Sequence, residues 1–293
     1  MLEVDGLNGC DGDEAKLTEL GCDYITGTVR LDKPIGGLHS LATELFRNEA
    51  TEGNKIRPFG MSGFKGFKCG AVEVAMREEE VMVRLSSHCA ATSWKQVVAL
   101  SDNVSRIDLQ ATVRAPFPPT SIINRHRKAA TRYSDSRRRG PKVRWVAEHR
   151  GGYTLYLGSR DSNVFGRIYD KWHKSKVDQY LGCVRYEVQF QDELAKFISR
   201  QLSQVRSPLP DIAAYIQQFF SGRGVRLQMP DVSKATYCCS RQRSDDLKTL
   251  EWLVKAVRPC IKSLKSRGKL EEVLAALELD HAFPIGDSGS LDQ

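Results

Sequence analysis

The stretch GGYTLYLGSRDSNVFGRIYDKWHKSKVDQYLGCVRYEVQF, residues 151–190, contains three short segments rich in aromatic and β-branched residues. Gly, Ser, Asn and Lys separate these segments, and the pattern predicts three β-strands, with the sequences YTLYLG, VFGRIYD and CVRYEVQF. Three strands this close together in the chain indicate an antiparallel sheet, because short connections join antiparallel neighbours.

The two later strands of this stretch carry the residue types of a phosphate-handling site. Residues two apart share one face of a strand, so Arg167 and Lys171 flank Tyr169, while Arg185 and Glu187 lie together on the next strand. A tyrosine flanked by cations, with a carboxylate on a neighbouring strand, could attack a phosphate. An amphipathic hairpin with a solvated polar face has the same pattern.

The bulk composition is that of a globular protein. A chain of 293 residues can form one large domain or two medium ones, and 41% hydrophobic with 27% charged residues excludes general disorder. No apolar run approaches the roughly 20 residues that span a bilayer, so we expect no membrane partner. The acidic, Gly-rich N-terminus is typical neither of a secretory signal nor of a transit peptide. Eight scattered cysteines without a CxxC pair argue against a structural zinc site or a disulfide framework and favour the cytoplasm.

The positive charge is concentrated in one segment. The net charge is +8, and residues 121–150 hold ten lysines and arginines against two acids, so the rest of the chain is neutral. Tyr133 and Trp145 are interleaved with these cations. Such a segment is expected to bind a nucleic-acid backbone through counterion release. The alternative is a solvated, flexible basic loop.

The remaining periodicity predicts the fold class. Strands are expected at residues 22–32, 69–76, 81–87 and 104–114, and helices at 36–50, from Thr92 or Ser93, at 191–205, at 211–220 and from Ser244 onward. This order predicts an α+β fold with a mainly antiparallel sheet flanked by helices and a helical C-terminal part. The domains expected are a flexible lead-in over 1–20, a sheet domain over 21–206 with a basic insertion at 121–150, and a helical region over 207–293.

Residues 104–190 also match the pattern of a known family. Arg106 and Asp108 form an Arg-x-Asp strand, Thr154 through Lys171 follow the block TxYxGSRxSxxxxRxYxK, and Arg185 with Glu187 forms an Arg-x-Glu strand. In this order the motifs resemble the replication initiation factor family, the trans-acting rolling-circle initiators of small plasmids and filamentous phages. The strand VMVRLSSHC is similar too, although Ser87 stands where the family commonly has Gly. The resemblance extends from about residue 20 to residue 190.

The resemblance implies a fold and an activity. The fold implied is a relaxase-like nuclease fold, with residues 21–206 as the nicking and DNA-binding domain. The activity implied is origin-specific nicking and rejoining of single-stranded DNA, in which a tyrosine attacks a phosphodiester, forms a 5′-phosphotyrosyl link and frees a 3′-hydroxyl. A divalent metal, Mg²⁺ or Mn²⁺, is implied beside the tyrosine. The alternative is a catalytically silent DNA-binding regulator of the same fold.

The match of RIYDK to the family's nicking strand favours Tyr169 as the nucleophile, with Tyr180 as the alternative. A tyrosine with a pKa of roughly 10 needs a cation or a metal to stabilise its phenolate. We therefore expect Arg167 and Lys171 to lower the pKa of Tyr169 or to hold the scissile phosphate.

Carboxylates are the expected metal ligands, because hard divalent cations prefer oxygen. Asp108 and Glu187 are the favoured pair. The alternative is plain cross-strand ion pairs, of Asp108 with Arg106 and of Glu187 with Arg185 or Lys171. Weaker candidates are Asp23, Glu148, His149 and Asp170.

The expected DNA contacts come from the turn GSRDS and from the basic segment. For the serine of this turn, a simple β-turn is the alternative to a DNA contact. The residues are Ser159, Arg160, Arg125, Arg127, Arg137, Arg138, Arg139, Lys142 and Arg144. The resemblance implies origin DNA, a host helicase and a host polymerase as partners in the cytoplasm of a bacterial cell. A homodimer is a further possibility for the apolar stripe in the tail.

Overall fold

The computed structural model describes residues 3–4, 15–30, 36–115, 117–138, 140–147, 152–228, 263 and 265–269. The chain divides into two compact units, Met1–Thr236 and Tyr237–Gln293. In the second unit the described residues include a few helical positions followed by a turn at Gly268. The helices expected from Ser244 onward otherwise lie outside the described residues.

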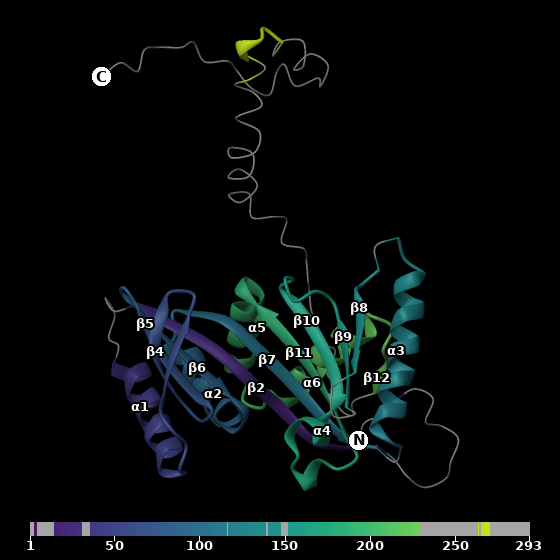
Figure 1. The fold of residues 1–293 in the computed structure, drawn as a ribbon, viewed down its shortest axis with the longest axis horizontal. Helices are drawn as coiled ribbons and strands as arrows, with labels where there is room; N and C mark the ends of the chain where they lie inside the picture. The colour runs from purple at the N-terminus through teal and green to yellow at the C-terminus, as the bar shows by residue number, and fades with distance from the viewer. Residues whose placement is uncertain are drawn as a thin grey trace. The chain divides into compact units, whose positions relative to one another are not determined.

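A ten-stranded sheet dominates the described part of the first unit (Figure 1). Its order is β3-β4-β5-β6-β2-β7-β11-β10-β9-β8, and each neighbouring pair is antiparallel. The strands are β2 (Lys16–Arg30), β3 (Arg57–Met61), β4 (Phe64–Cys69), β5 (Val72–Arg77), β6 (Glu80–Ser86), β7 (Asn103–Arg114), β8 (Val143–Ala147), β9 (Tyr153–Leu157), β10 (Val164–Asp170) and β11 (Cys183–Gln191). A separate pair joins β1 (Glu3–Val4) to β12 (Leu227–Gln228).

Helices cover one face of this sheet. They are α1 (Gly36–Thr51), α2 (Ser87–Leu100), α3 (Pro119–Asp135), α5 (Asp192–Gln204) and α6 (Leu209–Ser221), and the short α4 (Lys171–Ser175) and 3-10 turn η1 (Asp178–Tyr180) lie between β10 and β11. Contacts join α2 to β2 and β6, α5 to β7 and β11, α6 to β2, β7 and β11, and α3 to β8 through β11. No helix among the described residues is long and apolar enough to span a membrane.

The large aromatic side chains of β11 point toward these helices. On β11, Tyr186 makes an edge contact with Phe220 of α6, and Phe190 makes one with Tyr215 of the same helix. Side chains alternate between the two faces of a strand, so Arg185 and Glu187, the neighbours of Tyr186 in the chain, point to the opposite face. We call that opposite face the polar face, defined by Arg84, Arg106, Asp108, Arg167 and Glu187.

The two halves of the sheet repeat one topology. A long strand, a helix, four strands and a helix occur as β2-α1-β3-β4-β5-β6-α2 and again as β7-α3-β8-β9-β10-β11-α5, with α4 and η1 inserted in the second run. The long strands β2 and β7 pair at the centre, where Ile25 lies opposite Ile107. Ser87 and Asp192 begin the corresponding helices α2 and α5 with nearly equal positive φ angles, 50° and 52°. An approximate two-fold axis therefore passes between the two central strands.

The expected α+β class is confirmed, since a mainly antiparallel sheet is flanked by helices. The three strands expected within 151–190 are confirmed as β9, β10 and β11. The loop reading of residues 121–150 is wrong, because Ile122, Ile123 and Ala130 form a buried stripe that holds α3 on the sheet, and β8 follows. The helix expected from Thr92 or Ser93 begins earlier, at Ser87.

Two boundaries also differ from the expected ones. Residues 16–20 of the expected lead-in begin β2, because they pair with β7. The first unit continues to Thr236, past the boundary expected at residue 206. The physical reason is the apolar surface of α6, where Ile212, Ile216 and Phe220 are buried on the same sheet.

Candidate active site

The candidate catalytic residues lie on three adjacent strands of the polar face. On β10 and β11 the antiparallel register places Arg167 opposite Glu187 and Tyr169 opposite Arg185. Asp108 lies on β7, the next strand, beside Gln189 of β11. The structure therefore brings Tyr169, Arg167, Glu187 and Asp108 into one group.

Glu187 is the centre of this group. Its side chain is 2% exposed, and its two oxygens accept hydrogen bonds from the hydroxyl of Tyr169 and from Nε of Arg167. Burial by itself raises the pKa of Glu187, but Arg167, the Tyr169 hydroxyl and Arg185 together bring the pKa below its ordinary value. Glu187 is thus held as a carboxylate.

Asp108 is buried beside the same arginine. Both of its oxygens accept from Arg106, with Nε–Oδ1 at 2.8 Å and Nη2–Oδ2 at 2.6 Å, and Nη2 of Arg167 lies 3.6 Å from Oδ2. Burial raises the pKa of Asp108 above its ordinary value, and Arg106 and Arg167 oppose that rise. Arg167 therefore bridges Asp108 and Glu187. The pair of Asp108 with Arg106 is that of the ion-pair alternative, whereas Glu187 pairs with Arg167, which the alternative did not name.

Tyr169 is buried, with 4% of its surface exposed. Its pKa is well above the ordinary value because burial, and then the charge of Glu187, disfavour the phenolate, while Arg185 opposes them. The expected lowering of this pKa is therefore not found: Arg167 is paired with Glu187, and Lys171 begins α4 instead of extending the strand face. Nζ of Lys174 lies 4.5 Å from the centre of the Tyr169 ring and covers it.

A cavity of about 530 Å³ adjoins this group. Its lining includes Glu19, Asp23, Lys171, Tyr180 and Arg185. The hydroxyl of Tyr180 donates to Oε1 of Glu19 at 2.6 Å, and Nζ of Lys171 lies 5.0 Å from the centre of the Tyr180 ring. Burial and the bond to Glu19 raise the pKa of Tyr180, and burial lowers the pKa of Lys171. Both tyrosines considered as nucleophiles thus lie near Arg185, which is opposite Tyr169 in the strand register and 5.8 Å from the centre of the Tyr180 ring.

Asp170 has a local structural contact. It is the N-cap of α4, where Oδ1 accepts from the backbone N–H of His173 at 3.0 Å, and Oδ2 lies 3.0 Å from Nδ1 of the same histidine. The carboxylate therefore fixes the turn from β10 into α4. Of the other weaker candidates, Asp23 lines the cavity, and Glu148 and His149 lie outside the described residues.

The donor types near Glu187 fit a hard divalent cation, although Arg167 stands between Asp108 and Glu187. Asp23 is a further carboxylate that feels the charge of Glu187: burial, and then repulsion by Glu187, raise the pKa of Asp23. One oxygen of Asp23 pairs with Nη1 of Arg185 at 3.1 Å. A cation held between Asp23 and Glu187 would relieve that repulsion.

The expected DNA contacts fall on two sides of the sheet. The guanidinium groups of Arg144 and Arg160 lie 4.8 Å and 5.4 Å from the centre of the Tyr156 ring. Tyr156 pairs with Arg167 across β9 and β10, so these residues share the polar face. The hydroxyl of Ser159 accepts from the backbone N–H of Asp161 at 3.4 Å, as in the β-turn alternative.

The α3 residues lie on the helix-covered side. His126 of α3 contacts Tyr186 on that side, and Arg127 stacks on Trp145 at 5.3 Å. Arg125 lies on the same helix and is exposed. The exposed residues Arg137, Arg138 and Lys142 follow α3, and Arg139 lies outside the described residues.

Sequence reasoning missed a row of cations and rings on the first half of the polar face. The guanidinium of Arg106 lies 4.0 Å from the Tyr24 ring, and that of Arg84 lies 5.7 Å from Tyr24 and 5.2 Å from Phe59. The row continues from Asp108 toward the edge formed by β3. Its residues are more than 20 positions apart in the chain, so no local motif could reveal it.

The approximate two-fold axis allows the site residues to be compared with the corresponding residues of the other half of the sheet. Met82 lies as far before Ser87 as Glu187 lies before Asp192, so the two residues occupy corresponding positions. Met82 pairs with Ala75 of β5, whereas Glu187 pairs with Arg167 of β10. Met82 and Ala75 pack in an apolar cluster with Phe64. The second run therefore carries charged residues where the first carries an apolar core.

The sheet thus carries helices on one face and a tyrosine–arginine–carboxylate group on the other. The comparisons with known proteins name the family. The family model described as replication initiation factor matches residues 102–276. The chain belongs to this family, and its role is in the initiation of replication.

A similar solved structure is that of the rolling circle replication initiator protein from Geobacillus stearothermophilus. The two sequences are 18% identical, the match covers 79% of this chain and 91% of the other, and the TM-score is 0.49. A comparison with curated proteins found no match.

Proposed function

We propose that this protein starts rolling-circle replication by nicking one DNA strand at the origin and later rejoining it. The observation that carries the proposal is the hydrogen bond from the Tyr169 hydroxyl to the buried carboxylate of Glu187. A phenol with a raised pKa needs an adjacent base in order to act as a nucleophile. Glu187 is such a base, and Arg167 keeps it ionised.

In the nicking step, Oη of Tyr169 attacks the phosphorus of the scissile phosphodiester, and its proton passes to Glu187. The bond from phosphorus to the 3′ oxygen breaks, and that oxygen takes a proton from solvent. The products are a 5′-phosphotyrosyl link and a free 3′-hydroxyl, and rejoining is the reverse. Arg167 and Lys174 are close enough to Tyr169 to hold the negative charge of the phosphate.

Glu187 and Asp23 would hold a divalent cation such as Mg²⁺ or Mn²⁺, with Asp108 next to them. When bound, the cation would supply Lewis-acid stabilisation of the phosphate charge. Asp108 then acts mainly by positioning Arg167, because Arg106 already occupies both of its oxygens.

The single strand would run along the polar face. Stacking on aromatic rings combined with cationic contacts is the common mode of single-strand binding. Tyr156 with Arg144 and Arg160 supports this path on one side of Tyr169, and Tyr24 with Arg106 supports it on the other. Host helicase and polymerase are the partners that extension from the free 3′-hydroxyl requires, and a homodimer is compatible with this role.

The second candidate function is a DNA-binding regulator without nicking activity. The burial of Tyr169 beneath Lys174 favours it, since a substrate must displace that cover to reach the hydroxyl. Both functions predict DNA binding, and a covalent adduct distinguishes them.

The test uses the full chain with single-stranded oligonucleotides that tile the origin of its own replicon, in Mg²⁺ or Mn²⁺, followed by a denaturing gel. We expect a covalent adduct with the wild type and with Tyr180→Phe, and none with Tyr169→Phe. An adduct that is lost in Tyr180→Phe and kept in Tyr169→Phe would assign the nucleophile to Tyr180. DNA binding without an adduct in either metal would leave the regulator.

A further inference from the structure

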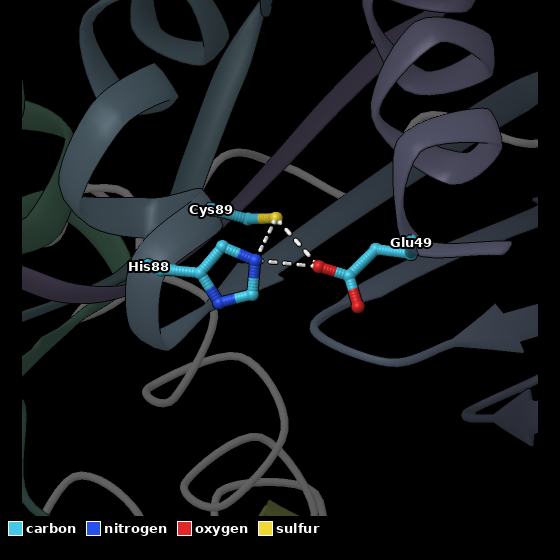
Figure 2. A group of neighbouring side chains, drawn as sticks. All are labelled: Glu49, His88 and Cys89. Atoms are coloured by element: carbon cyan, nitrogen blue, oxygen red, sulfur yellow. Dashed lines mark hydrogen bonds and ion pairs between the residues drawn. The ribbon is translucent and has the colours of Figure 1, made fainter. Parts of the chain in front are cut away.

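Three potential metal ligands meet between α1 and α2, the two helices of the first half of the sheet (Figure 2). Glu49 comes from the last turns of α1, and His88 and Cys89 come from the first turn of α2. Oε1 of Glu49 lies 2.7 Å from Nε2 of His88 and 3.1 Å from Sγ of Cys89, and the sulfur lies 3.4 Å from Nε2. All three ligand atoms thus converge on one point.

The backbone around this group is specifically shaped. Ser87 has a φ angle of 50°, a left-handed conformation that is uncommon for a non-glycine residue, and it turns the chain from β6 into α2. This turn sends the adjacent side chains of His88 and Cys89 toward α1. Such strain is retained where the surrounding contacts require that geometry.

The carboxylate of Glu49 is held from behind. Its other oxygen, Oε2, accepts from the backbone N–H of Ala71 at 3.0 Å and from Nδ2 of Asn54 at 2.9 Å. These bonds aim Oε1 at the sulfur and the imidazole. Hydrogen bonds of this kind orient metal ligands and are part of most protein metal sites. Glu49 is 2% exposed, so the carboxylate is fixed and little hydrated.

We propose that Glu49, His88 and Cys89 bind one Zn²⁺ ion, with water as the fourth ligand. Tetrahedral zinc has bonds of about 2.3 Å to sulfur and about 2.0–2.2 Å to nitrogen and oxygen, so its ligand atoms lie roughly 3.3–3.6 Å apart. The sulfur–nitrogen distance of 3.4 Å lies within this range, and the sulfur–oxygen distance of 3.1 Å is shorter and must lengthen on binding. The nitrogen–oxygen distance of 2.7 Å must widen, and His88, whose side chain is 62% exposed, is free to move.

The ligand types select the metal. A thiolate with an imidazole favours zinc over the hard cations Mg²⁺ and Mn²⁺. Binding exchanges the thiol proton of Cys89 for the ion, so one proton passes to solvent, and His88 binds through Nε2 with its proton on Nδ1. Nucleophilic chemistry is the competing use of such a cysteine, and it is disfavoured because Cys89 is buried, with 4% of its surface exposed.

The site would join two helices of the half that lacks the charged group. Glu49 on α1 and Cys89 on α2 would share one ion, which ties α1 to the start of α2. His88 also lines the 530 Å³ cavity that contains Asp23 and Arg185. The ion would therefore stabilise the part of the cavity wall that the start of α2 forms.

The experiment uses the full chain stripped of metal by a chelator and titrated with Co²⁺ as the probe, then with Zn²⁺ in competition. We expect tetrahedral d–d bands and a sulfur-to-cobalt charge-transfer band that Zn²⁺ abolishes. His88→Ala and Cys89→Ser should each weaken Zn²⁺ binding at least tenfold. His173→Ala is the matched control, a partly exposed histidine that also faces a carboxylate, and it should leave binding unchanged.

The chain has eight cysteines, so the change in the variants, not the total stoichiometry, decides the outcome. Because His88 is exposed, His88→Ala keeps the fold even if Cys89→Ser does not. Zn²⁺ should also raise the melting temperature of the wild type and not that of His88→Ala. Equal affinity in wild type and His88→Ala, or cobalt spectra without the charge-transfer band, would overturn the proposal.

Discussion

Lowering the pH from 7 to 5 should destabilise the protein through a single histidine, His126 of α3. Its side chain is 3% exposed, and Nε2 lies 3.1 Å from the hydroxyl of Tyr186. His126 also lines a cavity together with Arg125, Arg132 and Arg226. Burial, and then Arg125, lower the pKa of His126 to about 4 in the folded protein.

The sign of the pH effect on stability follows from the lowered pKa of His126. An unfolded histidine has a pKa of roughly 6.5, so between pH 6.5 and 4 the unfolded chain binds a proton that the folded protein does not. The contribution of His126 is fully present above pH 6.5 and is lost as the pH falls toward 4. For pKa values of about 4 and about 6.5, the loss between pH 7 and pH 5 is roughly 2 kcal/mol.

The assay is urea unfolding of the wild type and of His126→Gln at pH 7 and pH 5. Glutamine keeps a hydrogen-bonding group near Tyr186 and cannot titrate, so the other ionisable groups contribute equally to both proteins. The wild type should lose about 2 kcal/mol more than the variant over this interval. Equal losses in the two proteins would refute the reasoning, because the buried imidazole would then carry no shifted pKa.

Three further perturbations test the packing, the DNA path and the proton acceptor. Gly166→Ala should lower the free energy of unfolding by about 1–3 kcal/mol in urea titrations, because the new Cβ would lie 2.1 Å from Cε1 of Phe219. Arg144→Gln and Arg160→Gln should each reduce the slope of log affinity for single-stranded DNA against log salt by about 0.7, and an unchanged slope would remove that residue from the path. Glu187→Gln should slow adduct formation about 10²–10⁴-fold in single-turnover assays while DNA binding remains, and an unchanged rate would exclude Glu187 as the base.

Local periodicity was enough to predict the strands around the site. The alternation in VFGRIYD and CVRYEVQF identifies β10 and β11, and it correctly places Arg167 with Tyr169 and Arg185 with Glu187 on one face. Alternation depends on neighbouring residues alone, so it can be read directly from the chain. The same argument failed at Lys171, because the N-cap of α4 at Asp170 ends the strand one residue earlier.

The basic segment shows how context overrides composition. Its charges suggested a solvated loop, yet Ile122, Ile123 and Ala130 recur at helical spacing and are buried on the sheet. His126 lies on the same buried stripe. The amphipathic pattern was present in the sequence, and the density of arginines concealed it.

The sequence by itself determined the strand pattern, the basic segment and the motifs of the family, since these depend on local spacing and residue type. The tertiary structure decided which charged groups meet. Arg167 bridges Asp108 and Glu187 only because β7, β11 and β10 are neighbours in one register. Glu49 meets Cys89 through the packing of α1 beside α2. Such contacts join residues tens of positions apart, and their burial sets the pKa values, so they arise only when the chain is folded.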